Sequence, residues 1–267
     1  MYKAVVSDLD GTLLNGNHAI DEFTKETVSE VINRGIKFYI ATGRSYSGAK
    51  DIMDKLGLKI PLITSNGARI LDEEGNEIYV NNLEKKYSDS ILDIDYKKKG
   101  ESIVLNVYSG NDWYVTEDRR EFYMKINPKR TFFPEVTTIE KLKTKEFTKI
   151  FFLGEHDELL ELEKEIENIT KGEVNIAFVL EHCLEIFSKE SDKANAARFL
   201  LEKDGLTLKD SVAFGDGCND YNLLKETGKG YVMGNALYRL KEALPENETV
   251  ETNADNGVAK KLVELFL

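Results

Sequence analysis

Short apolar runs alternate with amphipathic segments along the first 64 residues. The runs 2–6, 36–41 and 61–64 are rich in β-branched and aromatic residues, which is typical of buried strands. Asp21 can cap a helix between the first two runs, and another helix is expected over about 47–56. Strand, helix, strand, helix, strand is the pattern of right-handed parallel crossovers. It predicts an α/β fold with a doubly wound, mostly parallel, Rossmann-like sheet.

The pattern changes after residue 68. A turn at 74–76 between two short apolar runs indicates a hairpin. A charged helix is expected over about 84–98, and further helices and antiparallel strands follow it, while 131–145 has no clear pattern. The doubly wound pattern then resumes. We therefore expect a core domain in two parts and an inserted α+β domain, with the boundaries 1–82, 83–187 and 188–267.

Composition and charge narrow the class of protein. The 267 residues are 41% hydrophobic and 31% charged, and no apolar run reaches the length of a membrane span. A net charge of −12 makes nucleic acid and anionic membranes poor partners. Two cysteines cannot form a disulfide framework, and the chain starts without a secretory leader, so we expect a cytoplasmic protein.

Polar side chains stand where the expected strands of the core end or its helices begin. In a parallel sheet these positions share one edge, which is where ligands bind. Several carboxylates with one lysine and no histidine make an oxygen-only site, which favours a hard cation such as Mg²⁺. The residues concerned are Asp8, Asp10, Thr42, Gly43, Arg44, Lys193, Asp216, Asn219 and Asp220.

This set of groups suits phosphoryl transfer. A phosphate needs its charge neutralised, an orientation and a nucleophile, and Mg²⁺ with Lys193 would supply positive charge. An aspartate such as Asp8 can attack phosphorus and form an aspartyl-phosphate. A second acid two residues later, Asp10, could protonate the leaving oxygen and then take a proton from water. The Thr42 hydroxyl and the amides of Gly43 and of the turn at Leu9 could donate hydrogen bonds to phosphate.

The same residues carry a resemblance to a known family. The stretches DLDGTLL from Asp8, ATGR from Ala41 and GDGCND from Gly215, together with Lys193, resemble the four ordered motifs of the haloacid dehalogenase superfamily. The match is closest to its Cof-type sugar-phosphatase branch, which also shows the stretch SNGA found here from Ser65. The resemblance implies that the inserted domain is the α/β cap of that branch.

The resemblance also implies roles for the acidic residues. Asp8 would be the nucleophile and a ligand of Mg²⁺, and Asp10 would be the acid/base and would touch the metal through its backbone carbonyl. Asp216 would ligate the metal. Asp220 would support either the metal or Lys193 from behind.

The remaining motif positions would bind the substrate. Thr42 and Lys193 would hold the phosphoryl oxygens, and Asn219 would contact phosphate. Arg44 would either position substrate or pair with an acid, and the Asn66-Gly67 pair is also a turn signal. The full set of expected substrate contacts is Leu9, Gly43, Arg44, Asn66, Lys193 and Asn219.

We therefore expect a Mg²⁺-dependent phosphatase acting on a small phosphorylated metabolite, a sugar phosphate by resemblance, as a monomer or small homo-oligomer. The catalytic motifs leave open a phosphomutase, which would return phosphate to a second hydroxyl instead of releasing it. A receiver or metabolite sensor also pairs acids with a threonine and a lysine. A sensor would bind phosphosugar without Mg²⁺-dependent turnover and would not need Asp10.

Overall fold

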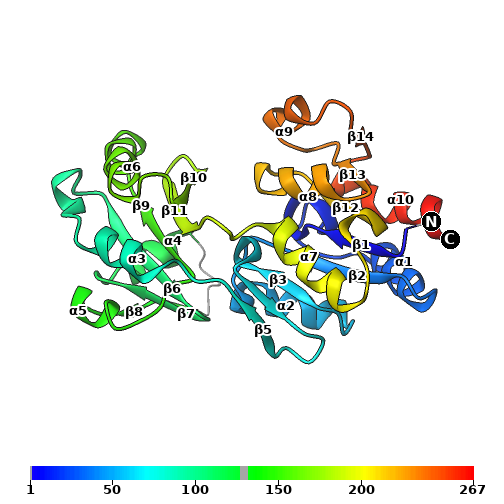
Figure 1. The fold of residues 1–267 in the computed structure, drawn as a ribbon, viewed down its shortest axis with the longest axis horizontal. Coiled ribbons are helices and arrows are strands. Elements are labelled where there is room, and N and C mark those ends of the chain that lie inside the picture. Colours follow the sequence, from blue (N-terminus) through cyan, green and yellow to red (C-terminus); the bar gives the residue numbers. More distant parts are fainter. Residues whose placement is uncertain (1, 127–131) are drawn as a thin grey trace. The chain divides into compact units, whose positions relative to one another are not determined.

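A computed structural model describes residues 2–126 and 132–267 and shows a chain that folds into two compact units (Figure 1). The first unit combines Met1–Val80 with Glu190–Leu267, and the second is the continuous segment Asn81–Lys189. The range 83–187, expected as an inserted domain, lies inside the second unit.

The first unit is built on a mixed sheet with a parallel centre. Its strand order is β14-β13-β12-β1-β2-β3-β4-β5, and only the pairs β3–β4 and β4–β5 are antiparallel. The α/β class and the doubly wound sheet predicted from the sequence are confirmed. The strands are β1 (Ala4–Ser7), β2 (Lys37–Ala41), β3 (Leu62–Thr64), β4 (Arg69–Leu71), β5 (Glu77–Val80), β12 (Ser211–Gly215), β13 (Lys229–Val232) and β14 (Glu248–Thr249).

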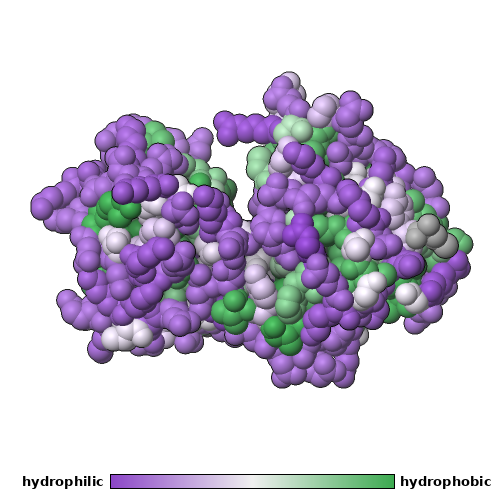
Figure 2. Space-filling model, in the orientation of Figure 1, coloured by the Kyte–Doolittle hydropathy of each residue, from purple (hydrophilic) through white to green (hydrophobic). Residues whose placement is uncertain are grey.

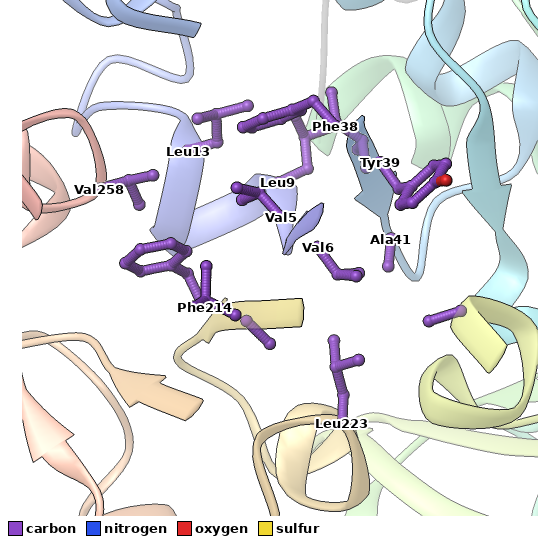
Figure 3. Packing of buried hydrophobic residues seen from close by; sticks show 14 of the residues in the cluster. Val5, Val6, Leu9, Leu13, Phe38, Tyr39, Ala41, Phe214, Leu223 and Val258 are labelled. Atoms are coloured by element: carbon purple, nitrogen blue, oxygen red, sulfur yellow. The ribbon is translucent and has the colours of Figure 1, made fainter. Parts of the chain in front are cut away.

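Helices cover both faces of this sheet. Figure 3 shows Val5 of β1 on the same side as Val258 of α10, whereas Val6 points toward Leu223 of α8. This alternation follows from the two-residue period of a strand, and it buries every residue of β1. The helices of this unit are α1 (Glu22–Asn33), α2 (Tyr46–Leu56), α7 (Lys193–Lys203), α8 (Tyr221–Glu226), α9 (Tyr238–Ala243) and α10 (Gly257–Phe266).

The second unit is an α+β domain with its own core. Its sheet has the order β10-β11-β9-β6-β7-β8, antiparallel except for the pair β7–β8. Alternate side chains of its central strands pack beneath α3 and α6. The elements are α3 (Lys85–Leu92), β6 (Val104–Ser109), β7 (Asp112–Val115), α4 (Arg120–Ile126), β8 (Glu135–Val136), α5 (Ile139–Leu142), β9 (Lys149–Leu153), α6 (His156–Thr170), β10 (Val174–Leu180) and β11 (Cys183–Ser188).

The helix expected over 84–98 was predicted too long. It ends at Leu92, and Tyr96–Lys98 forms a separate 3₁₀ turn. Ile94 and Tyr96 both pack on the core of this unit, and residues two apart cannot share one face of an α-helix. In the segment without a clear pattern, β8 and α5 form within 132–145, and Thr131 lies outside the described residues.

The surface agrees with the charged composition. Figure 2 shows a face that is mostly hydrophilic, with hydrophobic residues in small groups. Among residues 2–126 and 132–267, every helix is too short or too polar to cross a bilayer.

Candidate active site

The strand order brings the first and last parts of the chain to one sheet edge. Strand β1 lies between β12 and β2, and Ser7 is in register with Phe214 of β12 and Ile40 of β2. All three strands are parallel, so the residues that follow them leave the sheet at the same edge. Asp8, Thr42 and Asp216 are such residues, although more than 200 positions separate the first from the last.

Lys193 joins two of the acids. Its side chain is fully buried at the start of α7, where the Asp192 carboxylate caps the helix by accepting from the backbone N–H of Ala194. The Lys193 Nζ lies 2.6 Å from Asp8 Oδ1 and 2.6 Å from Asp220 Oδ1. Burial alone would lower the pKa of Lys193, but the charges of Asp220 and Asp8 raise it above its ordinary value.

Asp220 also organises the loop after β12. Its Oδ2 accepts from the backbone N–H groups of Asp216 at 3.0 Å and Gly217 at 2.9 Å, and its Oδ1 accepts from Lys193. Both carboxylate oxygens therefore have partners within the protein. Asp220 was expected to support either the metal or Lys193, and of these two partners the structure shows contact with Lys193.

Asp216 is held by the turn that follows β1. The Thr12 hydroxyl donates to Asp216 Oδ1 at 3.1 Å. Gly11 has a φ of +75°, and a Cβ at this position would overlap the Asp216 carboxylate. The sequence analysis assigned no role to Thr12 or Gly11. Both follow Asp10 directly in the first motif, and this position could have indicated that they belong to the site.

Three acids, of which Asp8 and Asp220 are buried and Asp216 is half-buried, are a suitable donor set for a divalent cation. Asp8, Asp216 and Asp220 each offer a carboxylate oxygen, and these oxygens lie within 4.8 Å of one another. Burial raises the pKa of Asp8, and burial together with the charge of Asp220 raises that of Asp216 to about 6. With Lys193 as the ammonium among them, three carboxylates leave an excess of negative charge, so these residues fit Mg²⁺.

Asp10 and Arg44 form a two-point ion pair. The Arg44 Nε donates to Asp10 Oδ2 at 2.6 Å, and Nη2 donates to Oδ1 at 2.5 Å. The Asp10 side chain is 38% exposed, whereas Asp8 is buried. Of the two alternatives for Arg44, the structure shows pairing with an acid, and this pairing fixes the orientation of the Asp10 carboxylate.

The loops after β2 and β3 meet the loop after β12. The Asn66 N–H donates to the Thr42 carbonyl at 3.1 Å, and the Asn219 side-chain amide donates to Asn66 Oδ1 at 2.9 Å. Asn66 has a φ of +55°, and Gly43 lies against its amide. The Thr42 Oγ1 accepts from the Arg44 N–H at 3.1 Å. These expected substrate-binding positions are thus brought together.

Leu9 enters the site only through its backbone. Its side chain is fully buried in the core beside Val5 (Figure 3), so the main chain alone could contact a phosphoryl group there. Sequence reasoning missed Asn235, whose amide donates to the Gly11 carbonyl at 2.7 Å, and Asn253, whose amide donates to the Leu14 carbonyl at 2.7 Å. Asn235 follows β13, so its place near a strand end was the signal that could have revealed it.

Comparisons with known proteins agree over the whole chain. A model of the haloacid dehalogenase-like hydrolase family matches residues 5–262. A protein of Buchnera aphidicola is 37% identical over 270 residues, which cover 100% of this chain and 99% of the relative. An HMP-PP phosphatase of Yersinia pseudotuberculosis is 31% identical over 262 residues, which cover 98% of this chain and 94% of the relative.

Solved structures show the same fold. A haloacid dehalogenase-like hydrolase from Bacteroides thetaiotaomicron matches with a TM-score of 0.85 at 26% identity, covering 100% of both chains. Family match, relatives and fold lead to one conclusion, which the resemblance of the four motifs had indicated. The chain belongs to the haloacid dehalogenase-like hydrolase family, and it is a phosphatase of that family.

Proposed function

We propose that this phosphatase hydrolyses a small phosphorylated metabolite, a sugar phosphate, in a Mg²⁺-dependent reaction with Asp8 as the nucleophile. The observation that carries the proposal is the meeting of Asp8, Lys193 and Asp216 at one sheet edge. Asp8 and Asp216 would hold Mg²⁺ through their carboxylates, and Asp10 would do so through its backbone carbonyl. The ion, when bound, neutralises phosphoryl charge.

Asp220 acts through Lys193 in this proposal. Both of its carboxylate oxygens already accept hydrogen bonds from protein donors, two from backbone N–H groups and one from Lys193. It therefore orients the ammonium of Lys193 toward Asp8 and the phosphoryl oxygens instead of ligating the metal directly.

The reaction proceeds in two displacements. A carboxylate oxygen of Asp8 attacks phosphorus, and the bond from phosphorus to the ester oxygen breaks. Asp10 protonates that leaving oxygen, which departs as the alcohol. Water then attacks the phosphorus of the aspartyl-phosphate, Asp10 takes a proton from the water, and inorganic phosphate leaves as Asp8 is restored. The pair with Arg44 belongs to the ionised form of Asp10, which takes the proton from water in the second displacement, whereas in the first displacement Asp10 carries the proton that it donates.

The proposal also concerns the part of the substrate that carries the phosphoryl group. The sugar assignment rests on the resemblance to the Cof-type branch, and a Yersinia relative is named an HMP-PP phosphatase. We also propose that the second unit, Asn81–Lys189, is the part of the chain that distinguishes one metabolite from another. A panel of hexose and pentose phosphates together with HMP-PP, assayed for phosphate release, tests this assignment.

The nucleophile is tested with a generic aryl phosphate. Wild type, Asp8→Asn and the exposed control Glu242→Gln are compared at saturating Mg²⁺. We expect Asp8→Asn to lose at least about 10³-fold in kcat and Glu242→Gln to keep the wild-type rate. Equal rates for wild type and Asp8→Asn would end the proposal.

The intermediate is tested by rapid acid quench with a ³²P-labelled substrate. We expect acid-stable radioactivity on the wild-type protein and none on Asp8→Asn. Release of inorganic phosphate, with no transfer to a second hydroxyl of a hexose phosphate, separates hydrolysis from the mutase alternative. Binding of phosphosugar without Mg²⁺-dependent turnover would instead indicate a sensor.

A further inference from the structure

The first unit has one histidine, His18, and it lies beside the acid/base of the proposed reaction. Its Nδ1 atom is 3.8 Å from Asp10 Oδ1, and the His18 side chain is 76% exposed. This distance is too long for a hydrogen bond, so the imidazole makes none with Asp10. The two displacements of the proposed reaction use Asp10 and leave His18 without a role.

A closed turn determines where His18 stands. The Asn15 N–H donates to the Ala19 carbonyl at 2.9 Å, and the His18 N–H donates to the Asn15 carbonyl at 2.9 Å. The Asn15 side-chain oxygen accepts from the backbone N–H groups of Asn17 at 2.9 Å and Ala19 at 3.3 Å. The backbone of this turn therefore fixes the place of His18, and its ring extends from there.

The backbone at His18 has a conformation that most side chains disfavour. Its φ is +54°, in the left-handed region that glycine adopts without strain. A histidine at this position costs free energy, and residues held in such conformations cluster at functional sites. The strain and the place beside Asp10 both indicate that the imidazole itself has a function.

The place beside Asp10 defines what the imidazole can reach. Asp10 protonates the ester oxygen in the proposed reaction, so this oxygen must come within hydrogen-bond distance of the Asp10 carboxyl group. The carbon atoms attached to the ester oxygen then lie next to Asp10, and His18 stands 3.8 Å from one of its carboxyl oxygens. The exposed ring of His18 can therefore turn toward the alcohol part of the substrate.

The chemistry of imidazole indicates which group it would bind there. A neutral imidazole carries one hydrogen-bond donor and one acceptor, and a hydroxyl group offers the same pair. An unsubstituted alkyl or aryl group offers neither. A substrate hydroxyl close to the ester oxygen is thus the group that His18 can recognise.

We propose that His18 is a specificity-determining residue of this phosphatase and binds a hydroxyl group close to the phosphate ester. This inference rests on the proposed function, because it requires Asp10 to lie beside the ester oxygen. It assigns the substrate to the phosphate esters of polyhydroxy compounds from contacts within the first unit alone.

Competition between two small esters tests the proposal. Glycerol 3-phosphate has a hydroxyl on the carbon next to the ester carbon, whereas propyl phosphate has the same chain length and no hydroxyl. Each competes with 4-nitrophenyl phosphate during its hydrolysis, so an inhibition constant is obtained even for an ester that is hydrolysed slowly. His18→Ala should weaken glycerol 3-phosphate at least about threefold, the effect of one hydrogen bond between neutral groups, and leave propyl phosphate unchanged.

Further variants separate recognition from folding. His18→Gln keeps a donor and an acceptor and should bind glycerol 3-phosphate within about twofold of the wild-type protein. Asn17→Ala, which removes a neighbouring exposed side chain of the same turn, should change neither inhibition constant. His18→Gly suits the left-handed backbone, so it should keep the wild-type melting temperature and still lose affinity for glycerol 3-phosphate.

Equal changes for the two esters in His18→Gly, or no change in either, overturn the role of His18. Failure of the proposed function has a different result. Equal hydrolysis of 4-nitrophenyl phosphate by the wild-type protein and Asp8→Asn would reject Asp8 as the nucleophile, while the ratio of the two inhibition constants would still report on His18.

Discussion

Lys193 is a charged side chain with no exposed surface, held between Asp8 and Asp220. Removing an ion from water costs several kcal/mol, and the two carboxylates offset that cost only while the ammonium is present. Asp216 adds a third carboxylate beside Asp8 and Asp220, so the site holds more acidic groups than the single ammonium of Lys193 can neutralise. Such a site is selected for chemistry at the expense of stability.

Removal of Lys193 should therefore destabilise the protein strongly. Lys193→Met leaves Asp8 and Asp220 buried without their cation, and we expect the free energy of unfolding to fall by about 3 to 5 kcal/mol at pH 8. The loss of stability should be smaller at pH 5, because protonation of Asp8 relieves the repulsion between its carboxylate and that of Asp220. Urea unfolding at the two pH values measures it. The exposed Lys55→Met provides the control, and an equal loss in both variants would contradict this account.

Asp8 and Asp216 make stability depend on pH. Both have pKa values raised above the ordinary 3.8, so the folded state binds more protons than the unfolded state in this range. The contribution of these two groups to the free energy of unfolding then falls as pH rises from 5 to 8. Asp216→Asn should reduce that fall by on the order of 1 kcal/mol, because Asp216 is partly exposed and its charge is screened.

Thermal melts in EDTA at pH 5 and pH 8 test this expectation, and Glu242→Gln serves as the surface control. Added Mg²⁺ should raise the melting temperature of the wild-type protein at pH 8 more than at pH 5, since it binds the ionised acids. An Asp216→Asn variant whose stability changes between pH 5 and pH 8 just as that of the wild-type protein does, without metal, would refute the assigned shift of Asp216.

At the scale of elements, the backbone conformation of the turn after β1 positions residues of the site. Gly11 adopts a positive φ and lies against Asp216, and the next residue, Thr12, donates to that same carboxylate. The Asn235 amide holds the Gly11 carbonyl from another strand end. The turn therefore positions Asp8 and Asp216 together, so its conformation should determine metal affinity.

Gly11→Ala should weaken Mg²⁺ binding at least about tenfold, because the added Cβ strains a positive φ and displaces the Asp216 carboxylate. Gly35→Ala is the matched control. Gly35 also has a positive φ, of +84°, but nothing lies within 4 Å of its Cβ position, so that variant should lose stability and keep its metal affinity. Calorimetric Mg²⁺ titration separates the two effects.

Local patterns predicted the well-marked elements. The Asp21 carboxylate accepts from the Thr24 N–H and begins α1, and Gly57 ends α2 in the left-handed conformation, as cap residues predict. The patterns missed β8 and β14, which have two residues each, and overextended α3. Such short strands have almost no period of their own and form only because a neighbouring strand offers backbone partners.

At the scale of the whole molecule, the described residues form two units that share no apolar cluster. The first unit is formed by two distant segments, while the second is continuous and packs around its own apolar cluster. The one tryptophan lies in the second unit, and the candidate metal ligands all lie in the first. The two units can therefore be observed separately in one protein.

Unfolding should not be a single two-state transition. Trp113 fluorescence reports the second unit, whereas far-ultraviolet circular dichroism reports both, and we expect their urea transitions not to coincide. Mg²⁺ should shift only the part of the dichroism transition that belongs to the first unit. Superimposable transitions, shifted together by Mg²⁺, would show instead that the two units unfold as one.

The sequence by itself determined which residues stand at strand ends and helix starts, because short-range periodicity and cap chemistry specify those positions. The order of the motifs also identified the family. Only the tertiary structure decided partners: Arg44 pairs with Asp10, Asp220 holds Lys193, and Thr12 holds Asp216. These contacts depend on strand order and register across most of the chain, and no local pattern encodes which carboxylate a distant cation will meet.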